Sequence, residues 1–215
     1  TDVLPFEEAK LYGHNAIHAM LGFIGTLKGY AKMPELAADK ALMHVAREAF
    51  IRDSGGALIR KYATLGDDLF TEAGYRVYAD DLLVRMTNPH LADSVARAAR
   101  DVVRKLSVND RIFGTMALAL EHGIEPKNMA MGALAGVALL LANATEYGVP
   151  VGCAPHTNSS SLDARCVVRT LQDLREDNLA QLLAWLWKTP ITPTLQRIVD
   201  GTYAARGPLG KVLIP

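Results

Sequence analysis

Cysteine is scarce in this chain of 215 residues, which contains only Cys153 and Cys166. So few cysteines cannot form a disulfide scaffold or a zinc site built from thiolates, and free thiols are typical of a reducing cytoplasm. Net charge is also missing, because 23 Lys and Arg residues balance 23 Asp and Glu residues. A chain without a charge excess has no general attraction for nucleic acid or for an acidic membrane surface. These absences favour a cytoplasmic protein with a small ligand.

Long apolar runs and glycine-rich phosphate loops are missing as well. The longest apolar run, Ala130 to Ala142, is shorter than the roughly 20 residues of a membrane-spanning helix, so it predicts a buried core helix. No glycine-rich fingerprint follows a strand, so we expect no dinucleotide site in this chain. The first residue is Thr1 rather than methionine, and we therefore expect a piece of a longer polypeptide.

Helical periodicity dominates what is present. Half of the residues are hydrophobic, which is enough for one core, and the length favours a single domain over residues 1–215. Ala, Leu, Arg, Glu and Met are abundant, whereas the Val/Ile/Thr alternation typical of strands is rare. The sequence therefore predicts an all-α, multi-helix domain.

The expected helices are bounded by proline, glycine and capping residues. The first starts at Pro5 and ends near Gly25 to Tyr30, and the last has Thr192 as its cap before Pro193 and ends near Ala204, ahead of a Gly/Pro-bearing tail. The others are Pro34–Asp53, Ala57–Leu65 after a Ser54-Gly55-Gly56 break, Asp67–Met86, Leu91–Leu106, Asp110–His122, Asn128–Asn143 and, after a loop over Val149–Ser161, Leu162–Trp187.

The first expected helix carries a polar arc. At about 100° per residue, Lys10, His14, Glu7 and His18 fall within about 80°, and Asn15 lies at about 140°. Such an arc is either a solvated helix face or the wall of a cleft, and spacing alone favours the solvated face. The surrounding residues are too apolar for a helix with a large wet surface, which favours the cleft.

A lysine in such a cleft loses hydration, which disfavours its charged form and allows it to accept a proton near neutrality. Lys10 is therefore a candidate general base. The amide of Asn15 is a neutral donor that can stabilise an alkoxide, and His18 can orient a hydroxyl. Together these groups predict alcohol oxidation without a metal.

Lys10-x-x-x-x-Asn15-x-x-His18, with Glu7 three residues before the lysine, resembles the signature of the mannitol dehydrogenase family, the polyol-specific long-chain dehydrogenases. The resemblance implies that Lys10 is the general base, that Asn15 belongs to the oxyanion-stabilising pair and that His18 contacts the substrate. It also implies that Glu7 takes part in proton movement. His14 stands where the family pattern has an apolar residue, and a packed, hydrogen-bonded histidine is the favoured interpretation there.

A second match lies about 80 residues downstream. Arg85-Met86-Thr87-Asn88-Pro89 is similar to a family turn, and Arg97-x-x-Arg100-Asp101-x-x-Arg104-Lys105-Leu106 is similar to a family Arg-Val-x-Arg-Asp run that ends in Lys-Leu. The resemblance implies that Arg97 and Lys105 bind substrate, with Arg85, Asn88 and Arg104 nearby. The blander interpretation of this segment is a basic helix face with weak surface ion pairs. The cluster of cations and the Ser107-x-x-Asp110-Arg111 ending favour the mannitol 1-phosphate branch of the family.

By resemblance, the fold is that of the C-terminal domain of 6-phosphogluconate dehydrogenase-like proteins. NAD or NADP is then bound mainly by an N-terminal Rossmann domain that this chain lacks, so we expect the chain alone to be inactive. The partners are that domain and a sugar alcohol or its phosphate, without nucleic acid or membrane. The alternatives are a hexuronate reductase acting on tagaturonate or fructuronate, and a helical interaction domain without chemistry. No metal is expected, because the remaining histidines (His44, His90, His122 and His156) lack ligand spacing.

Overall fold

The computed structural model describes residues 2–150 and 164–214. Within these two ranges the chain is helical and contains no strand, and Lys32 and Ser94 form an isolated antiparallel bridge. The predicted all-α class is therefore confirmed. No helix in the described part of the chain combines the length and apolarity needed to cross a membrane. Cys153, His156 and most of the loop predicted over Val149–Ser161 lie outside the described residues.

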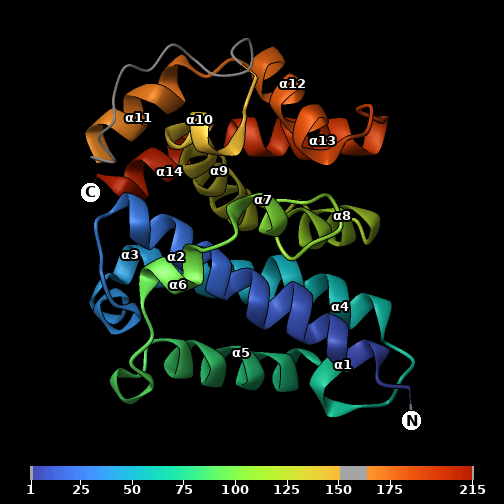
Figure 1. The fold of residues 1–215 in the computed structure, drawn as a ribbon. Coiled ribbons are helices and arrows are strands. Elements are labelled where there is room, and N and C mark those ends of the chain that lie inside the picture. Colours follow the sequence, from blue (N-terminus) through green and yellow to red (C-terminus); the bar gives the residue numbers. More distant parts are fainter. Residues whose placement is uncertain (1, 151–163, 215) are drawn as a thin grey trace.

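The first part of the chain fills the lower and middle parts of Figure 1. Its elements are α1 (Leu4–Glu8), the π-helix η1 (Ala9–Asn15), α2 (Ala16–Leu27), the 3-10 helix η2 (Met33–Ala38), α3 (Lys40–Glu48), the π-helix η3 (Ala49–Gly55), α4 (Gly56–Lys61), the 3-10 helix η4 (Asp68–Phe70), α5 (Glu72–Met86), the 3-10 helix η5 (Pro89–Leu91), α6 (Val95–Ala99), α7 (Val102–Lys105) and α8 (Phe113–Glu121).

The remaining elements are α9 (Lys127–Ala142), α10 (Ala144–Tyr147), α11 (Ala164–Asp173), α12 (Glu176–Trp187), α13 (Pro193–Ala204) and α14 (Arg206–Leu213). The cap predicted at Thr192 is confirmed, because its side chain accepts a hydrogen bond from the backbone N–H of Leu195 at 3.3 Å. The prediction that the chain ends in a tail after about Ala204 was wrong, because residues Arg206–Leu213 form α14.

The core is organised around α9, the helix predicted from the long apolar run. Every residue from Met129 to Leu141 is buried, and α9 packs on α2 on one side and on α13 and α14 on the other (Figure 1). Gly136 permits the close approach to α2, because a Cβ atom there would lie 2.9 Å from Cε2 of Phe23. Helix α2 is thus fixed from within the core, and it carries part of the predicted polar arc.

Several predicted helix boundaries were wrong, and two of them have a clear physical reason. The Ser54-Gly55-Gly56 segment does not end the helix, because α3 continues through η3 into α4. The two glycines instead make room for neighbouring side chains. A Cβ atom on Gly55 would lie 2.5 Å from Tyr75 Cδ1, and one on Gly56 would lie 2.8 Å from Ile124 Cδ1. The expected helix Leu91–Leu106 is instead divided, because Asp101 adopts a left-handed conformation with φ 61° between α6 and α7.

Candidate active site

The segment that carries Lys10, His14 and Asn15 is a π-helix rather than the α-helix expected from the sequence. A π-turn forms i→i+5 hydrogen bonds and advances fewer degrees per residue, so the angles calculated at α-helical period do not hold between Ala9 and Asn15. Such turns occur inside α-helices, frequently at functional sites. Here the π-turn joins α1 to α2 in one continuous helix, and it sets the direction in which the predicted catalytic side chains leave the backbone.

An aromatic cluster packs against this π-turn. Phe50 packs edge-on against Tyr75 and Tyr78, with ring centroids 5.9 and 5.7 Å apart. A Cβ atom on Gly13 would lie 2.7 Å from the Tyr75 hydroxyl oxygen, and the Tyr78 hydroxyl donates a hydrogen bond to the Ala9 carbonyl at 3.3 Å. The turn therefore rests on a rigid, buried framework.

One turn after η1, His18 meets a residue from the second motif region. His18 Nε2 lies 2.9 Å from Asp93 Oδ2, and Arg97 donates to the same carboxylate from Nε and Nη2, both at 2.6 Å. Helices α2 and α6 pack side by side to allow this (Figure 1). Gly22 makes the approach possible, because a Cβ atom there would lie 2.6 Å from the carbonyl carbon of Ala98.

Burial and hydrogen bonding act in opposite directions on this cluster. Asp93 is only 9% exposed, and burial by itself would raise the pKa of its carboxyl group. The hydrogen bonds from Arg97 and His18 outweigh burial and lower that pKa to about 2. For His18, burial lowers the pKa, and the attraction of Asp93 offsets only part of the effect. The dominant state at neutral pH is therefore an ionised carboxylate next to a neutral imidazole and a guanidinium.

Lys105, at the end of α7, lies close to the same cluster. Its side chain is buried, and Nζ donates a hydrogen bond to the Ala98 carbonyl at 2.7 Å. Burial, followed by the charges of Arg111 and Arg104, lowers its pKa to about 8. The charge of Lys105 also contributes to lowering the pKa of His18. His18, Arg97 and Lys105, predicted from two separate motifs, are thus brought together.

Lys10, Glu7 and Asn15 have a more open environment. Lys10 and Glu7 are exposed and Asn15 is half-buried, and none of their side chains forms a hydrogen bond or an ion pair with another described residue. The cleft expected around Lys10 is therefore not closed by residues 2–150 and 164–214 alone. His14 links the two parts of the arc, because its ring lies 6.4 Å from that of His18, centroid to centroid. Its pKa is lowered by burial and then by His18, Lys10 and Arg85.

The other three predicted residues have local partners. Arg85 is exposed and lies 3.7 Å from Asp81, although its charge reaches His14. Arg104 is shared between Asp101 at 3.4 Å and Asp110 at 3.6 Å.

The side chain of Asn88, the last of the three, accepts the backbone N–H of His90 at 2.9 Å, which caps η5. No hydrogen bond connects Arg85, Asn88 or Arg104 to His18 or Arg97 in the described part of the chain.

Asp93 is the site residue that sequence reasoning missed. The sequence suggested only weak surface ion pairs for this segment, yet Asp93 is buried and binds two of the predicted substrate residues. Its i,i+4 spacing to Arg97 was visible in the sequence. Its contact with His18 was not, because 75 positions separate them.

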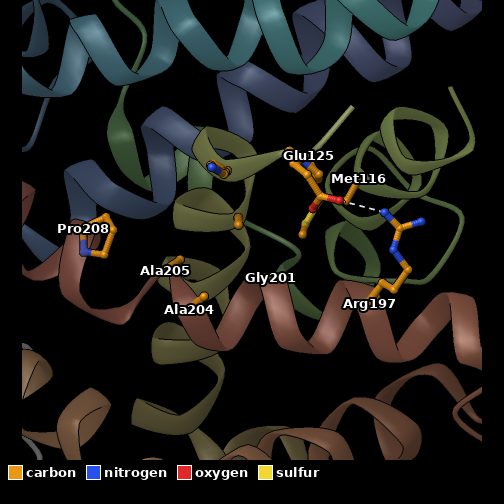
Figure 2. Close-up of a pocket in the computed structure, with 10 residues that line it drawn as sticks. Met116, Glu125, Arg197, Gly201, Ala204, Ala205 and Pro208 are labelled. Atoms are coloured by element: carbon orange, nitrogen blue, oxygen red, sulfur yellow. Dashed lines mark hydrogen bonds and ion pairs between the residues drawn. The ribbon is translucent and has the colours of Figure 1, made fainter. Parts of the chain in front are cut away.

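A pocket with mostly apolar walls lies elsewhere, between α8, α9, α13 and α14. Met116, Gly201, Ala204 and Ala205 line it, and the ion pair of Glu125 with Arg197, 2.7 Å long, crosses its edge (Figure 2). None of the predicted site residues lines this pocket.

Among the described residues, no three His, Cys, Asp or Glu side chains gather as a metal site would require.

Comparisons with known proteins identify the family of this chain. Residues 2–182 match the family model of the mannitol dehydrogenase C-terminal domain. A mannitol-1-phosphate 5-dehydrogenase from Exiguobacterium sp. is 32% identical over 136 residues, which are 63% of this chain and 34% of that protein. The mannitol 2-dehydrogenase of Pseudomonas fluorescens, solved as a ternary complex with NAD and D-mannitol, has a similar fold with a TM-score of 0.62 at 21% identity.

The structural similarity covers 99% of this chain and 41% of the Pseudomonas chain, so the matched residues span less than half the length of either protein. The match over residues 2–182 includes both sequence motifs, Asp93 and the helices that join them. The resemblance inferred from the motifs is therefore confirmed, and the chain belongs to the mannitol dehydrogenase family, matching its C-terminal domain.

Proposed function

We propose that this chain is the substrate-binding and acid–base part of an NAD(P)-dependent polyol dehydrogenase that interconverts a hexitol phosphate, mannitol 1-phosphate, and its keto-sugar. The observation that carries the proposal is the shared carboxylate of Asp93. It binds His18 from the first motif and Arg97 from the second, with Lys105 nearby. A polar cluster of this kind on a rigid helical framework suits a substrate with many hydroxyl groups.

In this proposal Lys10 takes the proton from the reacting hydroxyl, and in the reverse direction it returns that proton to the carbonyl oxygen. Asn15 donates a hydrogen bond to the alkoxide, and Glu7 exchanges protons between Lys10 and solvent. Bound nicotinamide, held mainly by residues outside this chain, supplies the hydride acceptor. Lys10 forms no hydrogen bond or ion pair with another described residue, which fits a site completed by another part of the protein.

A phosphorylated substrate is supported by the charge of the second motif. Between residues 93 and 111, five cationic side chains stand against three carboxylates. Arginine binds phosphate through its planar fork and lysine as a point charge. The name of the Exiguobacterium relative, which shares 32% identity, supports the same substrate class.

The direct test is a Lys10→Ala variant of the whole gene product that contains this chain. We expect turnover of mannitol 1-phosphate to fall by at least about 10²- to 10⁴-fold, the usual contribution of acid–base catalysis. Lys40→Ala is the matched control, because Lys40 is an exposed lysine at the start of α3 and should leave turnover unchanged.

Substrate profiling separates the remaining possibilities. Preference for tagaturonate or fructuronate would identify a hexuronate reductase instead, whereas turnover that survives Lys10→Ala would refute the assigned base. No turnover of any polyol or keto-sugar by the whole gene product would favour a helical interaction domain. We also expect the 215-residue chain alone to be inactive.

A further inference from the structure

The hydrogen bond between His18 and Asp93 fixes the protonation of the imidazole ring. Asp93 is buried and also receives two hydrogen bonds from Arg97, so its carboxylate is ionised and can only accept. His18 Nε2, 2.9 Å from that carboxylate, must therefore be the donor. Because a neutral imidazole carries a single N–H, Nδ1 of His18 is left with a lone pair and acts as an acceptor.

The described residues do not engage all the hydrogen-bonding groups of His18 or of Arg97. No described residue forms a hydrogen bond with His18 Nδ1, and the imidazole is 21% exposed. A guanidinium has five N–H donors, and Arg97 gives two of them to Asp93 while its side chain remains 62% exposed. The pair therefore offers one unused acceptor together with several unused donors.

We propose that Asp93 is a positioning residue that holds His18 in the Nε2–H tautomer, so that His18 Nδ1 and Arg97 together recognise a neutral hydroxyl group of the substrate. This inference rests on the proposed function and adds which chemical group of the substrate is bound at this position. The hydroxyl proton is donated to Nδ1, and the hydroxyl oxygen, or that of a neighbouring hydroxyl, accepts from Arg97. A polyol chain supplies both parts.

A phosphate does not suit the same position. Near neutral pH a phosphate ester carries mainly acceptor oxygens, because its second proton leaves with a pKa of about 6. An acceptor oxygen placed against the Nδ1 lone pair would be repelled, although Arg97 alone would attract it. The cationic groups around His18 (Arg97 and Lys105) also disfavour protonation of the ring, while Asp93 favours it. His18 and Arg97 therefore bind a hydroxyl group, and a substrate phosphate would be bound by other cationic residues.

The tautomer can be measured without any turnover. Long-range ¹H–¹⁵N NMR of the histidine rings distinguishes a protonated from an unprotonated nitrogen, and the His18 signals are identified by their loss in His18→Gln. We expect the 215-residue chain to show Nε2 protonated and Nδ1 unprotonated in His18. A ring protonated at Nδ1 would overturn the proposal, and this measurement requires no variant of Asp93.

Asp93→Asn should reverse the tautomer. Arg97 has only donors, so the amide oxygen turns toward Arg97 and the amide NH₂ faces Nε2, which then becomes the acceptor. Asp80→Asn is the matched control, because Asp80 forms the same paired contact with Arg47, at 2.7 and 2.9 Å, without a histidine. We expect the control to leave the His18 ring signals unchanged. A variant at Asp93 with unchanged ring signals would show that Asp93 does not set the tautomer.

Kinetics of the whole gene product test recognition of the hydroxyl. In the wild type, one member of a series of monodeoxy hexitol substrates should show a KM about tenfold higher, as expected for one lost hydrogen bond. Asp93→Asn should raise the KM of the parent substrate about tenfold and abolish the discrimination against that analogue, whereas Asp80→Asn should do neither. Equal discrimination in Asp93→Asn and wild type would overturn the inference while leaving the dehydrogenase intact. Absence of any polyol turnover in the wild type would instead overturn the proposed function, and with it the hydroxyl ligand.

Discussion

Asp53→Asn offers a sharp test of how burial governs a charged group in this fold. Asp53 lies in η3, is 2% exposed, and accepts hydrogen bonds from the backbone N–H groups of Asn128 and Met129 at 2.8 and 2.7 Å. The Asn128 side chain adds a third at 3.1 Å. The carboxyl group thus caps the first turn of α9 from 75 residues away.

Burial outweighs these hydrogen bonds and raises the pKa of Asp53 from 3.8 to about 6. A carboxyl group whose pKa is raised in the folded state binds its proton more tightly there than in the unfolded chain. Its contribution to stability is therefore complete below about pH 4 and is lost as the pH rises through about 6. A difference of about two pKa units corresponds to about 3 kcal/mol of unfolding free energy.

Asn is a neutral replacement of the same shape that keeps one acceptor for the cap. The unfolding free energy of the wild type minus that of Asp53→Asn should fall by about 3 kcal/mol between pH 4 and pH 7. Urea denaturation followed by circular dichroism at several pH values measures this difference. Glu121→Gln, at an exposed residue of α8, is the control for the removal of one carboxyl group, and the change with pH should be larger for Asp53→Asn than for this control. A difference for Asp53→Asn that stays constant or increases with pH would refute the reasoning.

Two further predictions concern packing and capping. Gly22→Ala places a Cβ atom 2.6 Å from the Ala98 backbone, so α6 must move away from α2, and the unfolding free energy should fall by about 1–3 kcal/mol in denaturant titrations. Gly201→Ala is its control, because the nearest atom to a Cβ there is 3.9 Å away, and the same measurement should show no loss; equal losses in both variants would contradict the close-approach argument. Thr192→Ala removes the hydrogen bond to Leu195 N and should lower the unfolding free energy by about 1 kcal/mol, whereas Thr192→Ser should preserve it. Indistinguishable Ala and Ser variants would show that the cap does not stabilise α13.

Elements with strong local signals were predictable from the sequence. The buried run that became α9 and the Thr192-Pro193 start of α13 follow from apolar length and capping chemistry, which act within a few residues. The Ser54-Gly55-Gly56 segment misled the prediction, because its glycines make room for Tyr75 and Ile124 instead of ending a helix. That role depends on neighbours from distant parts of the chain, which local propensity does not contain.

In the candidate site, likewise, the residues that belong to sequence motifs could be predicted, whereas contacts between distant segments could not. His18, Arg97 and Lys105 were expected from two motifs, and the structure brings them together. Asp93, which joins two of them, has no motif of its own, and its role arises only when α2 packs on α6. The exposure of Lys10 was likewise invisible, since the apolar residues around it suggested a closed cleft.

The π-turn at Ala9–Asn15 makes the active-site geometry depend on the number of residues between the core and the lysine. Such a turn accommodates one residue more than the α-helical turn that would otherwise occupy its place. If the same residues were wound as an α-helix throughout, everything before the turn would be rotated by about 100° about the helix axis. Lys10 would then extend from a different side of the helix. Because the additional residue is absorbed within the π-turn, the side of the helix from which Lys10 extends depends on that turn.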